Sequence, residues 1–272
     1  MADHGIEVLV FDVFGTVVDW RSALLAEYRA LAARKRWSVD GQRFLERWES
    51  VRRATFDRVN DGSMPGINLS RIYRHRLDEV VDEFGLGGLD DAERDAFTRA
   101  WCRPVPWPDS LPALDRLKRK LVLATLTNSD FAWAVAMARL VGLPWDCVLT
   151  AELFDRYKPA PQTYDGALAL LDVAPERAMM VACHNYDLAA AAAHGMRTAC
   201  ARHSSRARSS AQSRRRINAR RATGRSLPPI SASSPSGWAP EAARAMATGL
   251  PVSRLTPALP LFGRGASRLW NT

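Results

Sequence analysis

The sequence predicts an α/β fold in which a doubly wound parallel sheet carries a helical module inserted after its first strand. Short apolar runs alternate with helical patterns in residues 104–201, whereas residues 19–103 show helical patterns alone. The chain has 272 residues, 47% of them hydrophobic, which is enough to bury one large core or one core and a smaller module.

Five short apolar runs are typical of buried parallel strands, which are apolar nearly throughout because helices cover both faces of their sheet. The runs occupy residues 6–11, 120–126, 146–151, 177–183 and 197–201. Helical patterns occupy residues 131–142, 162–173 and 187–195. Gly142 and Gly195 stand where helix C-caps are expected. Strands that alternate with helices of this length indicate a doubly wound sheet.

Residues 19–103 are predicted to form a helical cap over the carboxyl edge of the sheet. Helical patterns occupy residues 21–37, 41–59, 69–85 and 90–101, with no strand-like run between them. Four prolines between Arg103 and Pro112 indicate a stiff return to the sheet. The predicted core therefore consists of residues 1–18 and 104–201. One alternative stays open, in which all helices pack directly on the sheet.

The residues after Ala201 differ in composition from the rest of the chain. They hold thirteen arginines, one acid and no lysine, a net charge of +12, so the whole-chain value of +9 leaves about −3 for the first 200 residues. Such an Arg, Ser and Pro-rich segment cannot bury enough to order itself, which predicts disorder over residues 202–272. Two origins stay open: a reading-frame shift, and a genuine basic tail that binds nucleic acid or another anionic surface.

The cellular setting expected from the sequence is the reducing cytoplasm. The cysteines Cys102, Cys147, Cys183 and Cys200 are widely spaced, which suggests neither a zinc motif nor a disulfide framework. The first residues carry acids where a secretory signal would carry positive charge. No apolar run approaches the roughly 18 residues that span a bilayer, so no membrane partner is expected.

Polar residues follow four of the predicted strands, at the edge where ligands bind in α/β sheets. They are Asp12 and Thr16; Thr127 and Asn128; Lys158 and Tyr164; and His184, Asn185 and Asp187. Each alone has an ordinary structural explanation as a cap, a turn residue, a solvated lysine or a buried histidine. Their joint occurrence at successive strand ends predicts one site.

Four segments resemble the motifs of the haloacid dehalogenase superfamily: "FDVFGTVVD", "LTNSD", "YKPAPQTY" and "HNYDLAAAAAHG". Residues 6–201 resemble its type II branch, the L-2-haloacid dehalogenases. The resemblance implies a Rossmann-like core, a helical cap and an active site between them. It also implies hydrolysis of short L-2-haloalkanoic acids to D-2-hydroxy acids, with halide as the second product.

The resemblance assigns roles to these residues. Asp12 would attack the α-carbon of the substrate and form an aspartyl ester, which water then hydrolyses. Lys158 would keep Asp12 ionised, because an opposite charge a few ångströms away lowers a carboxylate pKa by about 1–3 units. Asp187 would orient Lys158 and the water, and Thr16 would steady the nucleophile. The substrate-binding residues implied are Phe14, Thr127, Asn128, Tyr164, His184 and Asn185.

Phe14 argues against phosphoester hydrolysis. In phosphatases of the superfamily, the matching segment looks like DxD, and its second aspartate protonates the alkoxide leaving group. A halide leaves as a stable anion and needs no such acid. Hard dications prefer several oxygen ligands, and the fourth motif offers one acid, so neither a metal nor another cofactor is expected. Two alternatives remain: a phosphatase or phosphonatase-like hydrolase, and an inactive protein whose basic tail binds nucleic acid.

The cap departs from the type II pattern at Glu49, where the resemblance implies an arginine that aids halide departure. Arg47, Arg52 and Arg53 are the candidates to replace it. In the fourth motif His184 replaces a more usual asparagine, and is expected to share in holding the hydrolytic water. The expected partner is a small 2-haloacid, and a homodimer is left open.

Overall fold

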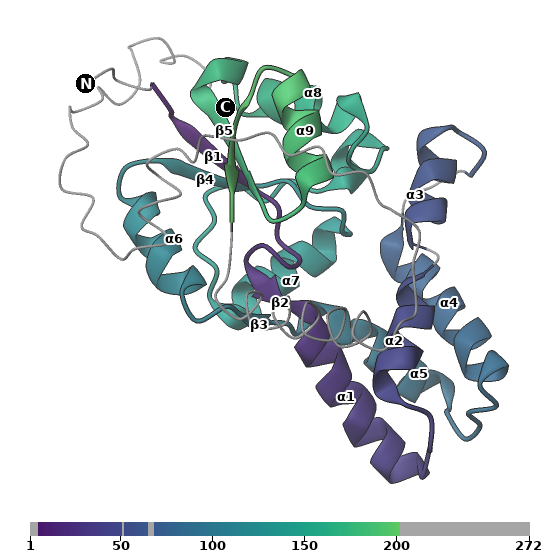
Figure 1. The fold of residues 1–272 in the computed structure, drawn as a ribbon. Helices are drawn as coiled ribbons and strands as arrows, with labels where there is room; N and C mark the ends of the chain where they lie inside the picture. The colour runs from purple at the N-terminus through teal and green to yellow at the C-terminus, as the bar shows by residue number, and fades with distance from the viewer. Residues whose placement is uncertain (1–4, 51, 65–67, 202–272) are drawn as a thin grey trace, which may run out of the picture.

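The computed structural model describes residues 5–50, 52–64 and 68–201. At its centre lies a parallel sheet with the strand order β4-β1-β5-β6 (Figure 1). The strands are β1 (Val8–Phe11), β4 (Val122–Thr125), β5 (Ala178–Ala182) and β6 (Arg197–Cys200). Val8 pairs with Val122 on one side and with Ala178 on the other, so β1 is a central strand. The predicted α/β class is confirmed.

Helices cover both faces of the sheet, as the apolar strands require. They are α6 (Ser110–Lys118) and α7 (Phe131–Val141) on one face, and α8 (Pro161–Leu170) and α9 (Asn185–Ala193) on the other (Figure 1). Successive side chains of β1 point to opposite faces. Leu9 therefore packs in a cluster with Met137 of α7, and Val10 in a second cluster with Ala167 of α8. This double burial explains why β1 shows no polar alternation.

The helices inserted after the first strand form a separate layer beside the sheet (Figure 1). They are α1 (Trp20–Lys35), α2 (Gly41–Glu49), α3 (Arg52–Asn60), α4 (Leu69–Glu83) and α5 (Asp91–Thr98), followed by the short 3-10 helix η1 (Arg99–Cys102). Side-chain caps begin several of them, for example Asp40, which accepts the amide hydrogen of Arg43 at 3.0 Å. Their apolar faces meet in a cluster that includes Phe44, Trp48 and Leu77.

A two-stranded antiparallel ribbon joins the helical cap to the sheet. Its strands are β2 (Val18–Asp19) and β3 (Val105–Pro106), one at each crossing of the chain. Ser110 ties this ribbon to the core, because its hydroxyl donates to the Val17 carbonyl at 2.7 Å. The predicted boundaries at 18/19 and 103/104 fall beside the ribbon, and the division into these domains stays a prediction.

Two predicted elements differ in the structure. Residues 146–151 are not a regular strand: they make isolated bridges at Cys147 and Thr150. The Leu149 amide donates to the Thr125 hydroxyl at 2.9 Å, so a side-chain oxygen takes the place of a backbone carbonyl in the strand pairing. The single helix predicted over residues 41–59 is two helices. Ser50 ends the first, because its hydroxyl donates to the Arg47 carbonyl at 2.7 Å and competes with the helical backbone.

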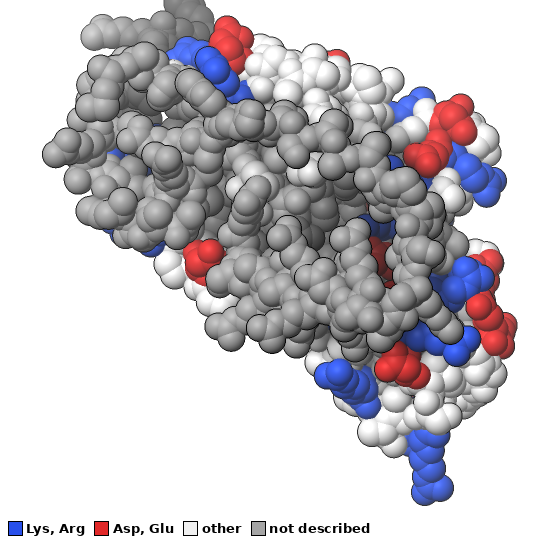
Figure 2. Space-filling view, viewed as in Figure 1, with Lys and Arg blue, Asp and Glu red and all other residues white. Residues whose placement is uncertain are grey.

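Acidic and basic side chains are interspersed over the outer face of the cap (Figure 2). Arg74, for example, pairs with Asp78, Asp91 and Asp95. Among the described residues, no helix has both the length and the apolar character needed to cross a membrane. The predictions for residues 202–272, namely disorder, a shifted reading frame and nucleic-acid binding, lie outside the described residues.

Candidate active site

Asp12 directly follows β1 and lies at the carboxyl edge of the sheet. The side chain is buried, and the backbone turns at Gly15, whose φ of +85° disfavours any residue with a side chain. Thr16 donates its hydroxyl hydrogen to Asp12 Oδ2 at 2.6 Å, while its oxygen accepts the Cys183 amide hydrogen at 2.9 Å. The Cys183 contact thus orients the threonine proton toward the carboxylate.

Lys158 joins two carboxylates inside the protein. Its Nζ lies 3.0 Å from Asp12 Oδ1 and 2.5 Å from Asp187 Oδ2, and all three side chains are buried. Tyr164 donates its hydroxyl hydrogen to the other oxygen of Asp187 at 2.6 Å. A buried ionic group is tolerated only when partners satisfy its charge, and Asp12, Lys158 and Asp187 each have two hydrogen-bond partners in this network.

The network fixes the charge states of its members. Burial acts to raise the pKa of Asp12, but Lys158, His184 and the Thr16 hydroxyl together hold that pKa below its ordinary value. Burial acts to lower the pKa of Lys158, but the two carboxylates keep it above its ordinary value. Burial raises the pKa of Asp187, which Lys158 offsets only in part. Asp12 is therefore ionised, and the neighbouring Asp187 is the more basic of the two carboxylates.

The loop that carries Lys158 is held from both layers of the molecule. From the core, the Asn128 side-chain oxygen accepts the Lys158 amide hydrogen at 2.8 Å, and its nitrogen donates to the Lys158 carbonyl at 3.1 Å. From α3 of the cap, Asn60 makes the same pair of bonds with the backbone of Tyr157, at 2.8 and 3.0 Å. Two amide side chains thus position one ammonium.

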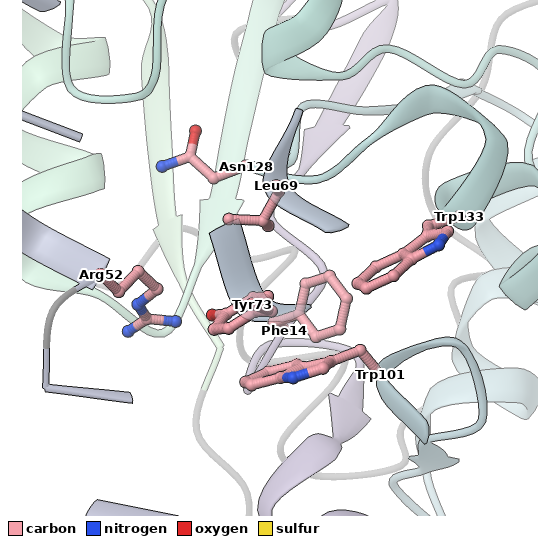
Figure 3. Close-up of a pocket in the computed structure, with 7 residues that line it drawn as sticks. All are labelled: Phe14, Arg52, Leu69, Tyr73, Trp101, Asn128 and Trp133. Atoms are coloured by element: carbon pink, nitrogen blue, oxygen red, sulfur yellow. The ribbon is translucent and has the colours of Figure 1, made fainter. Parts of the chain in front are cut away.

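A small cavity lies between the cap and the sheet and is partly open to solvent. Its lining is Phe14, Arg52, Leu69, Tyr73, Trp101, Asn128 and Trp133 (Figure 3). Figure 3 shows Arg52 and Trp133 on opposite sides, with Phe14 and Tyr73 between them. Burial raises the pKa of Tyr73 to about 12, so its hydroxyl keeps its proton. The cavity thus combines aromatic walls with the polar groups of Arg52, Tyr73 and Asn128.

Among the three candidate arginines, Arg52 is the one in the cavity lining. Arg47 pairs with Glu83 on the exposed face of the cap, and Arg53 stacks over the Tyr186 ring with 5.4 Å between the guanidinium carbon and the ring centre. Glu49, which stands where an arginine is implied, lies 2.8 Å from Arg52 and holds its guanidinium in place.

The other predicted residues differ in how directly they reach Asp12. His184 Nε2 lies 3.7 Å from Asp12 Oδ2 and 3.2 Å from the Phe14 carbonyl. Tyr164 is fully buried behind Asp187 and is absent from the cavity lining. The Thr127 hydroxyl is buried and has no hydrogen-bond partner among the described residues. Asn185 is exposed in the first turn of α9, and the structure does not join it to the network.

Sequence reasoning missed Asp130, which couples the cap to the core. An acid just before a helix is typical of an N-cap, and Asp130 does precede α7, yet its side chain makes no cap bond there. Its buried carboxylate instead accepts the amide hydrogens of Leu69 at 2.5 Å and Ser70 at 3.0 Å, at the start of α4. No local pattern reveals a partner 60 residues away.

Cys183 was also missed as part of the site. A hydrogen bond with Cys183 and the charge of Asp12 raise the pKa of His184, despite its partial burial. Burial acts to raise the pKa of the Cys183 thiol, but the hydrogen bond with His184 brings it below its ordinary value. Adjacency to His184 in the sequence was the available signal.

Comparisons with known proteins show the family of the chain. The family model of haloacid dehalogenase-like hydrolases matches residues 6–195. An (S)-2-haloacid dehalogenase of Pseudomonas sp. (strain CBS-3) is 26% identical over 199 residues, which cover 71% of this chain and 83% of that protein. A crystal structure of an L-2-haloacid dehalogenase is 42% identical with a TM-score of 0.68, covering 72% of this chain and 84% of the other. A defluorinating L-2-haloacid dehalogenase is 35% identical with a TM-score of 0.69, covering 72% and 80%.

Proposed function

Because the chain belongs to the haloacid dehalogenase-like hydrolases, in their L-2-haloacid dehalogenase branch, we propose that it hydrolyses short L-2-haloalkanoic acids. The products are D-2-hydroxy acids and halide. The observation that carries this proposal is a buried, ionised Asp12 with an apolar Phe14, and no proton donor, two residues later. A carboxylate nucleophile without a paired acid suits a leaving group that departs as a stable anion.

In the first step an oxygen of Asp12 attacks the α-carbon of the substrate from the side opposite the halogen. The carbon–oxygen bond forms while the carbon–halogen bond breaks, and the halide leaves with the bonding electrons. The configuration at the carbon inverts. Lys158 and Thr16 each bind one Asp12 oxygen, so the carboxylate is aimed before the substrate arrives.

In the second step water attacks the carbonyl carbon of the Asp12 ester. We assign Asp187 to accept a proton from this water, because burial raises the pKa of this carboxylate and Lys158 holds it beside Asp12. The ester carbon–oxygen bond on the carbonyl side breaks, and the proton on Asp187 passes to the departing alkoxide oxygen, so that the hydroxy acid leaves. The second proton of the water goes to solvent, and Asp12 is restored as a carboxylate. His184, 3.7 Å from Asp12, helps to hold the water.

Two groups are suited to bind the anionic parts of the substrate. The buried Thr127 hydroxyl, without a partner among the described residues, gains one when it donates to the substrate carboxylate. Arg52 in the cavity lining brings a positive charge to the departing halide, in the role that the family pattern gives to an arginine. The aromatic walls offer apolar contact to a short alkyl chain.

The setting and assembly belong to the same proposal. We infer a small 2-haloacid as the partner of the cavity, and a cytoplasmic setting from the scattered cysteines. No cofactor takes part in the two steps above. A homodimer and nucleic-acid binding by the basic segment remain alternatives from the sequence.

The experiment measures halide release from each enantiomer of 2-chloropropionate, with and without chelator, for the wild type and Asp12→Asn. We expect turnover of the L enantiomer alone, with no loss on addition of chelator and none of the activity left in the variant. Release of phosphate from a generic phosphoester, without halide release, would overturn the assignment.

A further inference from the structure

We propose that Asp12, Cys183 and His184 form a binding site for Zn²⁺ or a similar thiophilic dication, and that an ion bound there blocks the nucleophile. The three side chains each offer one ligand atom, and these atoms all lie within 4.8 Å of one another. The sequence did not suggest this site, because Cys183 and His184 are adjacent whereas Asp12 comes from another strand.

One of the ligand spacings already suits a tetrahedral ion, and since all three atoms lie within 4.8 Å of one another, small side-chain movements complete the site. Zinc lies about 2.0–2.3 Å from oxygen, nitrogen and sulfur ligands, so ligand atoms on one ion are about 3.3–3.7 Å apart. Asp12 Oδ2 and His184 Nε2 are already 3.7 Å apart.

Gly15 leaves room for about one methyl-sized group beside two of the ligands. A Cβ placed on Gly15 would lie 3.4 Å from Cys183 Sγ and 3.6 Å from His184 Nε2, so both atoms border the volume that its missing side chain vacates. The backbone around this space is fixed, because the Cys183 amide is bonded to Thr16 at 2.9 Å. A small ion therefore needs little rearrangement of the chain.

The donor set selects the kind of metal. One thiolate, one imidazole and one carboxylate suit zinc, with a fourth position left for water. Magnesium requires six oxygen donors and has no use for sulfur, so it is a poor competitor here. Binding displaces the thiol proton to solvent. The hydrogen by which His184 Nε2 contacts the Phe14 carbonyl moves to Nδ1 or to solvent, so that Nε2 is free to ligate the ion.

The charge around the site favours a dication. Asp12 and Asp187 carry two negative charges against the single positive charge of Lys158. A Cys183 thiolate brings the net charge of the group to −2, which one Zn²⁺ neutralises. An ion on Asp12 Oδ2 takes up the electron pairs that the nucleophile needs, so bound zinc stops turnover.

The test titrates the full chain with Co²⁺, which reports a cysteine ligand through a thiolate-to-cobalt absorption band. We expect the band to saturate at one equivalent, to vanish when Zn²⁺ displaces the cobalt, and to persist in excess Mg²⁺. Cys183→Ala should lose the band. Cys147→Ala, which removes another half-buried thiol away from Asp12, should keep it. Absence of the band in the wild type, or its survival in Cys183→Ala, would overturn the site.

Inhibition is measured separately, so that failure of the proposed function and failure of the site remain distinguishable. One equivalent of Zn²⁺ should abolish halide release by the wild type, and chelator should restore it. Relative to its own zinc-free rate, Cys183→Ala should need at least about tenfold more zinc for half-inhibition. Cobalt binding without any loss of halide release would refute blocking of the nucleophile. A cobalt band in a chain that releases no halide would refute the dehalogenase proposal alone.

Discussion

Asp12 is ionised at a buried position, where burial alone would favour its protonated, uncharged form. Lys158 and Thr16 supply the opposing interactions, at 3.0 and 2.6 Å. These residues were predictable because the ends of parallel strands meet at one edge of a sheet. The two hydrogen bonds between the Asn128 side chain and the Lys158 backbone were not predictable. They depend on the path of a loop, which no periodic pattern specifies.

Replacing Lys158 by methionine tests how Asp12 keeps its charge. Without the ammonium, burial raises the pKa of Asp12, so a smaller fraction is ionised at each pH. The acid limb of the kcat/KM profile should move to higher pH, with activity rising as pH increases through the raised pKa. At neutral pH the rate should fall at least about 100-fold. The control is Lys118→Met, which removes an exposed lysine paired with Asp146 and should leave the pH profile unchanged. An acid limb that does not shift in Lys158→Met would contradict this account.

Arg52→Gln tests the assignment of the halide-facing cation. The guanidinium lines the cavity, so its loss should lower kcat by about 100-fold or more, as for other groups that stabilise developing charge. Steady-state halide release gives kcat, and stopped-flow measurement of the first turnover gives the rate of the displacement step. Arg47→Gln removes an arginine from the exposed face of the same cap and should change kcat less than twofold. Equal effects of the two substitutions would rule out a specific role for Arg52.

Single elements of the fold begin and end where side chains compete for the backbone. Most helices of the cap were predictable from apolar spacing and capping acids. The break at Ser50 and the irregular 146–151 segment were not, because a hydroxyl of one residue takes a backbone partner in each case. The start of α4 at Leu69 was predictable, because Asn68 caps the helix locally by accepting the Arg71 amide hydrogen, but its contact with the distant Asp130 was not.

Asp130→Ala tests whether this contact positions the cavity wall. It removes the acceptor for two amide hydrogens of α4, which should cost about 1–2 kcal/mol in the free energy of unfolding. Because Leu69 and Tyr73 of α4 line the cavity, KM for 2-chloropropionate should also rise several-fold.

Asp90→Ala is the matched control for this substitution. Asp90 caps α5 within the cap and makes the same kind of bond to Glu93 at 2.8 Å. Urea unfolding should show a similar loss of stability, about 1 kcal/mol, with KM unchanged. A KM that rises equally in both variants would show that cap stability, and not the contact with Asp130, sets the cavity.

At the scale of the whole molecule, one apolar cluster links the cap to the core. Trp48, Tyr73 and Trp101 of the cap share it with Ala151 and Tyr157 from the loop before Lys158. The sequence predicted a helical cap on an α/β core, but not this continuity, because side chains that meet across an interface have no fixed spacing in the chain.

The shared cluster predicts that cap and core unfold together. Tryptophan fluorescence, which reports Trp48 and Trp101 of the cap cluster together with tryptophans of the core, and far-ultraviolet circular dichroism, which reports the helices and strands of both layers, should give coincident urea transitions. A saturating 2-haloacid that binds between the layers should raise both midpoints together. Two separated transitions would show that the cap is stable independently of the core.

Isotope labelling of Asp12 measures the central claim most directly. After repeated turnover of L-2-chloropropionate in H₂¹⁸O, mass spectrometry of the peptide that contains Asp12 should find heavy oxygen in this carboxylate. A single turnover with excess protein should give a hydroxy acid that carries light oxygen, because that atom comes from Asp12. An unlabelled Asp12, with heavy oxygen in the first product formed, would mean that water attacks the substrate directly and would contradict the ester intermediate.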